Sequence, residues 1–202
     1  MNQKKAIRQL RELEKLSKKP RLAAEGWKQP WQCLIATALS ARTKDETTIV
    51  VCNKLFKKYN LQQLAKAKFS AVAKIIKPVN FYKNKTKNII ACAKMLVKIG
   101  KVPVDISELV KLPGVGRKTA NVFLAEMGEA AIGVDTHISH ISQKLGWTKN
   151  KNPHKIEEDL KKLFPKNFWS KINYIIVGFG RTYQRGKKRD ELIEKLIKHS
   201  LF

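Results

Sequence analysis

Two short segments contain residues whose types and spacing could carry out chemistry together. The first is LPGVGRKTA, residues 112–120, and the second is VDTH, residues 134–137. Glycine is used where a turn is tight or where the backbone must approach a partner closely, and a helical run follows Gly114 and Gly116 directly. The N-terminus of a helix presents free N–H groups to an anion. This segment therefore predicts an anion-binding turn.

The charge of the chain indicates which anion this turn binds. Its 202 residues include 42 Lys and Arg against 16 Asp and Glu, a formal net charge of +26. Such an excess favours polyanionic partners, although in a lysine-rich proteome part of it would simply cover solvated faces. The anion that we expect is a DNA phosphate.

Lys118 and Asp135 form a potential nucleophile and carboxylate pair. Lys118 lies in the first helical turn, where the positive end of the helix dipole disfavours an ammonium group, and partial burial would add to this effect. A neutral amine with a carboxylate nearby is what a reaction through a Schiff base needs. The alternatives are a lysine that contacts phosphate or solvent, and an aspartate that only caps the helix beginning at Thr136. Capping and catalysis are compatible roles.

The residues LPGVGRKTAN and VDTH resemble the helix-hairpin-helix DNA glycosylases, in particular the endonuclease III branch, and the resemblance extends from about Trp31 to Tyr183. It implies an all-α fold with two helical domains that flank an active-site cleft. A six-helix domain would span residues 24–131, and residues 1–23 and 132–202 would form the other. It also implies excision of a damaged base from double-stranded DNA, after which the abasic site is nicked.

The resemblance assigns roles to the chemical pair. Lys118 would attack the anomeric carbon of the damaged nucleotide and expel the base, and the resulting Schiff base would permit β-elimination of the 3′ phosphate. Asp135 would support deprotonation and stabilise the positive charge that develops on the sugar. Oxidised pyrimidines are the substrates that this branch suggests.

The same resemblance indicates DNA contacts. An enzyme that acts on a base within a duplex must flip it out, and Arg42 and Phe81 align with residues that fill the gap, although many endonuclease III proteins have glutamine at the position of Arg42. A core role explains Phe81 equally well. Lys85 is expected to contact the phosphate backbone, with a solvated helix face as a nearly equal alternative. His137 is better explained as a local helix residue than as a phosphate neighbour. The hairpin contacts would come from Gly114, Val115, Gly116, Arg117 and Thr119.

The C-terminus departs from the endonuclease III pattern. Those proteins usually end in four cysteines, spaced C-x6-C-x2-C-x5-C, that hold a four-iron four-sulfur cluster. Here Gln184 stands where the first cysteine belongs, and the only cysteines are Cys33, Cys52 and Cys92. We therefore expect buried free thiols, no iron–sulfur cluster and no metal ligands, although some relatives bind a monovalent cation at the hairpin.

A basic stretch, residues 185–189, occupies the place of the cluster loop. Lys187 and Lys188 would contact phosphate there, unless the stretch is a solvated tail.

Helical periodicity dominates the chain, with Thr43 and Glu46 suggesting a capping box. No apolar run is long enough to span a bilayer, and the N-terminus lacks the apolar core of a signal peptide. We expect a monomer in the cytoplasm, associated with the nucleoid. The expected helices cover about 2–18, 31–40, 43–59, 61–66, 70–77, 84–99, a short segment after 105, 116–128, 135–146, 153–164, 167–180 and 190–200.

Four other functions are alternatives to this one. Glycosylases for 8-oxoguanine have a hairpin less like LPGVGRKTAN, whereas a mismatch uracil or thymine glycosylase stays open. Adenine glycosylases of this superfamily usually lack the lysine found here as Lys118. A non-catalytic helix-hairpin-helix DNA-binding protein would need neither Lys118 nor Asp135.

Overall fold

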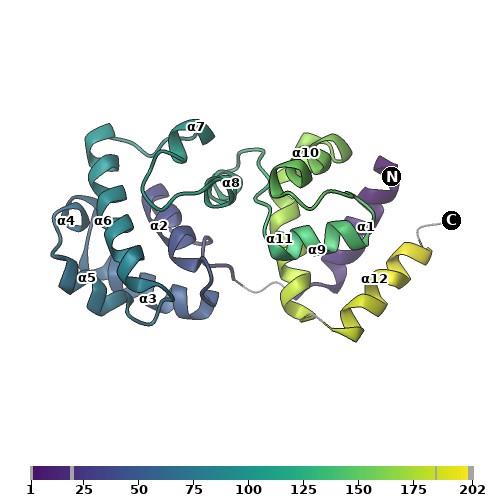
Figure 1. Ribbon diagram of the computed structural model, residues 1–202, viewed down its shortest axis with the longest axis horizontal. Helices are drawn as coiled ribbons and strands as arrows, with labels where there is room; N and C mark the ends of the chain where they lie inside the picture. Colours follow the sequence, from purple (N-terminus) through teal and green to yellow (C-terminus); the bar gives the residue numbers. More distant parts are fainter. Residues whose placement is uncertain (1, 19–20, 185, 200–202) are drawn as a thin grey trace. The chain divides into compact units, whose positions relative to one another are not determined.

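The computed structural model describes residues 2–18, 21–184 and 186–199, and all regular elements in these ranges are helical (Figure 1). The all-α prediction is confirmed. The chain divides into two compact units: Arg21–Met127, called here the hairpin unit, and Met1–Pro20 with Gly128–Phe202, called the terminal unit. The sequence had suggested boundaries at 24 and 131.

The hairpin unit is built around α2 (Pro30–Ser40), which packs against α3 (Asp45–Lys58), α6 (Tyr82–Ile99) and α8 (Arg117–Glu126). These neighbours explain why α2 is apolar on nearly all sides, since a helix with this pattern is a buried one. Its fully buried side chains include Leu34, Ile35 and Leu39. The other helices of the unit are α4 (Leu61–Ala65), α5 (Phe69–Ile76) and α7 (Ile106–Leu109).

The terminal unit is built around α11 (Trp169–Thr182), which packs against α1 (Gln3–Leu16) and α9 (Thr136–Lys144). The remaining elements are α10 (Pro153–Leu163), the 3-10 helix η1 (Lys166–Phe168) and α12 (Lys187–His199). Because α1 packs on α11 and on α12, the two ends of the chain share one core. That core contains Leu10, Leu13, Ile138, Ile176, Phe179 and Ile193.

Several helix starts follow local capping rules. Asn60, Asp105, Asp135 and Asn152 each accept a backbone N–H of the following turn, and Gly100 ends α6 with a left-handed φ of 79°. These short-range bonds depend only on neighbouring residues, so a sequence can predict them.

The capping box expected at Thr43 is wrong. Helix α3 begins at Asp45, its N-cap is Lys44, and no side chain caps it. The hydroxyl of Thr43 instead accepts the backbone N–H of Asn80 at 3.1 Å. A donor brought in by tertiary packing has taken the place of the local one.

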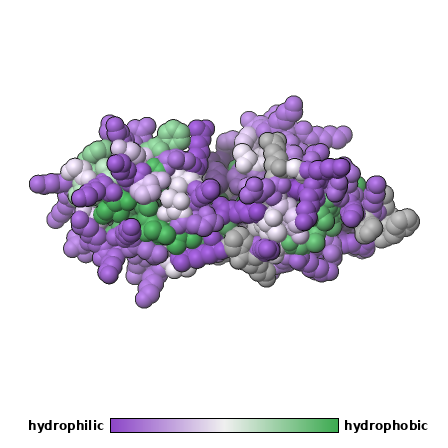
Figure 2. Space-filling view, turned by 90° about the horizontal axis from the view of Figure 1, so that it is seen from below, coloured by the Kyte–Doolittle hydropathy of each residue, from purple (hydrophilic) through white to green (hydrophobic). Residues whose placement is uncertain are grey.

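Most of the molecular face shown in Figure 2 is hydrophilic. Apolar side chains gather in a few patches of this face. No helix of the described ranges is long and apolar enough to cross a membrane.

Candidate active site and DNA-binding residues

The glycine-rich segment forms a tight turn before α8. The N–H of Val115 donates to the carbonyl of Leu112 at 3.0 Å, and Gly114 has a φ of 79°. Proline at the second position and a left-handed glycine at the third are the signature of a type II turn. A Cβ on Gly114 would also lie 2.8 Å from the Cβ of Asn88 on α6. Gly114 is thus required both by its backbone conformation and by close packing.

Gly116 is a glycine for a different reason. It is the N-cap residue of α8 with an ordinary φ of −86°, and a Cβ on it would meet nothing within 4 Å. Nothing in the protein itself therefore demands glycine here. Within the described ranges, neither Gly114 nor Gly116 uses its N–H in a hydrogen bond, so both groups are available to an external acceptor.

Lys118 is the second residue of α8, as expected, but its side chain is exposed. The partial burial that we anticipated is not found in this structure. Arg117 is also exposed, whereas Val115 and Thr119 are 5% and 8% exposed. The side chains of Val115 and Thr119 are therefore buried, and the N–H of Val115 is already bound within the turn. The DNA contacts expected of these two residues stay predictions.

Asp135 is the N-cap residue of α9, where its Oδ1 accepts the N–H of Ile138 at 2.8 Å. The extended segment before it is pinned by Asn173 of α11. The Asn173 side chain accepts the N–H of Gly133 at 2.9 Å and donates to the carbonyl of Gly133 at 2.7 Å. Sequence reasoning missed this buried amide, although a lone asparagine within the apolar run after Ile172 was a usable signal.

His137 packs inside the terminal unit. Its half-buried ring lies so close to α11 that a Cβ on Gly180 would be 2.3 Å from His137 Nδ1. Burial lowers the pKa of His137, the charge of Asp135 opposes this effect, and Arg181 and Arg189 add to it. The packing supports the local role for His137 rather than the phosphate contact.

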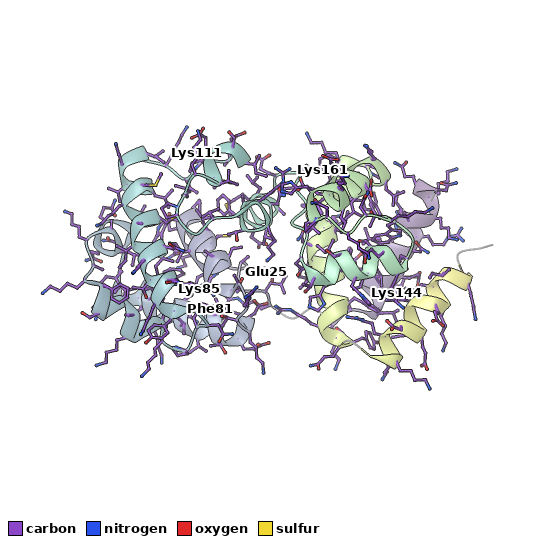
Figure 3. The ribbon with its side chains drawn as sticks, viewed as in Figure 1. Glu25, Phe81, Lys85, Lys111, Lys144 and Lys161 are labelled. Atoms are coloured by element: carbon purple, nitrogen blue, oxygen red, sulfur yellow. The ribbon has the colours of Figure 1, made fainter. Side chains whose placement is uncertain are left out.

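Arg42 and Phe81 lie together in left-handed backbone. Their φ angles are 56° and 58°, which non-glycine residues rarely adopt, and the Arg42 guanidinium lies 5.7 Å from the centre of the Phe81 ring. Phe81 is 60% exposed and sits where α6 begins (Figure 3). The core role for Phe81 is therefore excluded.

Lys85 is not a free surface lysine. Its Nζ donates to the carbonyl oxygens of Leu39 at 2.7 Å and Ala41 at 2.5 Å, and lies 3.4 Å from the Thr43 hydroxyl. Burial lowers the pKa of Lys85 to about 8. The expected phosphate contact is corrected, because its three N–H groups are directed at protein oxygens.

The residues of the basic stretch near the C-terminus differ in their exposure. Lys187 and Lys188 are exposed at the start of α12, and Lys188 lies 5.9 Å from the Tyr183 ring. Arg189 is 2% exposed, so its side chain is not part of the exposed basic surface. Arg185 lies outside the described residues.

The three cysteines are free and buried, as predicted. Burial raises the pKa of each thiol to about 12, which disfavours the thiolate that metals bind. Within the described part of the chain, no group of three or more His, Cys, Asp and Glu side chains is placed to hold a metal ion.

Comparison with known proteins shows the family of the chain. Residues 35–166 match the family model of the HhH-GPD superfamily base excision DNA repair proteins. The chain belongs to this family.

Within it, the relatives are endonuclease III proteins. Endonuclease III of Thermotoga maritima is 46% identical over 156 residues, which cover 75% of this chain and 73% of that protein. A solved non-covalent endonuclease III–DNA complex matches with a TM-score of 0.87 and 30% identity, over 100% of this chain and 97% of the other. A trapped endonuclease III–DNA covalent intermediate matches with a TM-score of 0.83 and 32% identity, over 93% and 90%. The protein is thus an endonuclease III-like DNA glycosylase and abasic-site lyase of base excision repair.

Proposed function

We propose that this enzyme removes oxidised pyrimidines from double-stranded DNA and nicks the resulting abasic site through Lys118. The amine attacks the anomeric carbon, the carbon–base bond breaks, and the base leaves with a proton. The sugar ring then opens at its C1′–O4′ bond, with a proton passing to O4′, which gives an imine on Lys118. This imine permits loss of a proton at C2′ and β-elimination of the 3′ phosphate. The observation that carries this proposal is an exposed lysine in the first turn of α8, directly after two glycines whose N–H groups are available.

In this proposal Asp135 supports the deprotonation and stabilises positive charge on the sugar. One carboxylate oxygen is occupied by the helix cap, at 2.8 Å from the Ile138 N–H, and the second is left for the reaction. Asn173 fixes the segment that carries it. A carboxylate held by a cap on a rigid helix is well suited to act at a defined position.

The phosphate contacts come from backbone at the hairpin. The open space at Gly116 supports this role, because a glycine that nothing in the protein demands is explained by close approach of a ligand. The hairpin carbonyls would also be the place for a monovalent cation.

Arg42 and Phe81 fill the gap left by the flipped nucleotide. The support is that an apolar ring is 60% exposed on strained backbone beside a guanidinium. Strained residues of this kind cluster at ligand clamps, and apolar side chains that enter a base stack are an established device. The guanidinium of Arg42 would donate to the orphaned base or to phosphate.

We further propose that the enzyme acts as a monomer on the nucleoid and needs no iron–sulfur cluster. The three cysteines supply fewer thiolates than the usual four, and all lie in the hairpin unit, on α2, α3 and α6. Packing of Ile193 holds α12 against the core of the terminal unit.

Borohydride trapping tests the proposed chemistry. The wild type should be trapped covalently on a duplex with an abasic site or thymine glycol, and Lys118→Ala should bind DNA but not be trapped. Lys111→Ala is the matched control, because it removes an exposed lysine that lies before the hairpin. Equal trapping of wild type and Lys118→Ala would place the nucleophile elsewhere.

Substrate choice is tested on duplexes with thymine glycol, 8-oxoguanine, uracil or an abasic site, scoring base release and nicking separately. Preference for 8-oxoguanine or for mismatched uracil would overturn the oxidised-pyrimidine assignment. Binding without any base release would support the non-catalytic alternative.

A further inference from the structure

Two turns of the hairpin unit, distant in sequence, are tied together at the place where Arg42 and Phe81 emerge. The turn between α2 and α3 carries Arg42, and the turn between α5 and α6 carries Phe81. The side-chain amide of Asn80 donates to the carbonyl of Arg42. The N–H of Asn80 donates to the hydroxyl of Thr43 at 3.1 Å. Asn80 thus binds two consecutive residues of the first turn, Arg42 and Thr43.

Lys85 completes this connection from the first full turn of α6. Its Nζ binds the carbonyl oxygens of Leu39 and Ala41 at 2.7 and 2.5 Å, and the Thr43 hydroxyl lies 3.4 Å away. The last carbonyls of a helix have no intrahelical donor, and the negative end of the helix dipole favours a cation. Lys85 therefore closes α2 and links it to the start of α6, where Figure 3 shows Lys85 and Phe81 at the same end of the helix.

This connection explains how two strained residues persist. Left-handed backbone is unfavourable for side chains other than glycine, and it survives only where the surroundings over-determine it. Arg42 and Phe81 are both in this conformation, and their contact with each other at 5.7 Å is exposed. Their own contact is therefore a weak restraint, and the bonds from Asn80 and Lys85 beneath them supply the rest.

We propose that Lys85, together with Asn80, is a positioning residue that holds Arg42 and Phe81 in the arrangement needed to replace a flipped base. This inference rests on the proposed function, because it takes Arg42 and Phe81 as the gap-filling pair. Lys85 acts through protein oxygens and does not touch DNA.

A lysine is well suited to this role. An ammonium offers three donors on a flexible stem, and three oxygen atoms surround Nζ here. Burial lowers the pKa of Lys85 only to about 8, so the ammonium form prevails at pH 7. A methionine would fill similar space and leave the carbonyls of Leu39 and Ala41 without this donor.

The experiment compares one lesion in two contexts. Single-turnover base release is measured for thymine glycol paired with adenine and for thymine glycol in a single-nucleotide bulge, where flipping costs less unstacking and unpairing. A small misplacement can lower a rate by up to about a hundredfold, so Lys85→Met should slow release from the paired lesion by about tenfold or more. Release from the bulge should fall by less than about threefold, because flipping is the step that the gap-filling pair assists and it costs less there. The steps after flipping are the same for both substrates.

Two further variants separate positioning from folding and from charge. Asn80→Ala removes an exposed side chain and cuts only the link to Arg42, so it should show the same selective loss without affecting the core. Lys94→Met removes an exposed lysine further along α6 and should match the wild type on both substrates. Melting curves verify that each variant is folded.

A double-mutant cycle tests whether Lys85 acts through the gap-filling pair. Residues that act as one unit are non-additive, so Lys85→Met with Phe81→Ala should be no slower on the paired lesion than the slower single variant. Additive losses, equal losses on both substrates, or a wild-type rate for Lys85→Met would each overturn the inference. If the wild type is not trapped by borohydride, the proposed chemistry fails. If Phe81→Ala has the wild-type rate while Lys85→Met is slow, only the positioning role fails.

Discussion

Asn173→Leu tests whether the buried amide of α11 holds the segment before Asp135. The substitution keeps a similar volume and removes both partners of Gly133, which lie 2.9 and 2.7 Å away. Asn173 is 7% exposed and Gly133 is buried, so water cannot easily replace the lost bonds. Each unsatisfied buried backbone group costs about 1–3 kcal/mol. The free energy of unfolding should therefore fall by about 2–6 kcal/mol.

Urea denaturation followed by circular dichroism measures this loss. A loss at the lower end corresponds to a fall in Tm of about 4–8 °C for a chain of this size. Single-turnover base release should fall as well, while DNA binding is retained, because the affected segment leads to Asp135 and not to the hairpin. Lys171→Ala, at an exposed position of the same helix, should stay within about 0.5 kcal/mol of the wild type. A similarly small change in Asn173→Leu would show that Gly133 does not depend on this amide.

Three further predictions follow from the same structure. Gly180→Ala should destabilise the protein by about 1–3 kcal/mol, because the new Cβ would lie 2.3 Å from His137 Nδ1; a wild-type Tm would mean that the ring moves away freely. The logarithm of the affinity for duplex DNA should fall against the logarithm of the salt concentration with a slope of about −4.5 to −6, if roughly five to seven phosphates are neutralised. Charge reversal at Lys187 and Lys188 should make this slope shallower. An unchanged slope would mean that α12 does not contact DNA. Burial lowers the pKa of Lys85 from 10.5 to about 8 in the folded protein. Between about pH 8 and 10.5 the unfolded chain therefore binds more protons, and the free energy of unfolding of the wild type should rise with pH relative to that of Lys85→Met. Parallel pH profiles of the two proteins in chemical denaturation would contradict the shift.

The features that the sequence alone determined depend on residues close together in the chain. The caps at Asp105, Asp135 and Asn152 and the helix end at Gly100 were predictable, since each is a bond or a backbone conformation within one turn. The hairpin was also predictable, because Pro-Gly specifies its turn locally. The resemblance of LPGVGRKTAN and VDTH to the endonuclease III branch supplied the family, which the comparisons confirm.

Only the tertiary structure decided which partner each long-range polar group would find. Lys85 looked like its exposed neighbours in an α6 rich in lysine, but packing of α6 on α2 placed it beside carbonyls from another helix. Arg189 looked like part of a basic tail and became buried because α12 packs into the terminal core. Thr43 had a local capping partner available and bound Asn80 instead. A buried polar side chain forms hydrogen bonds with the groups that packing brings next to it. Packing depends on contacts between helices, which no short stretch of sequence contains.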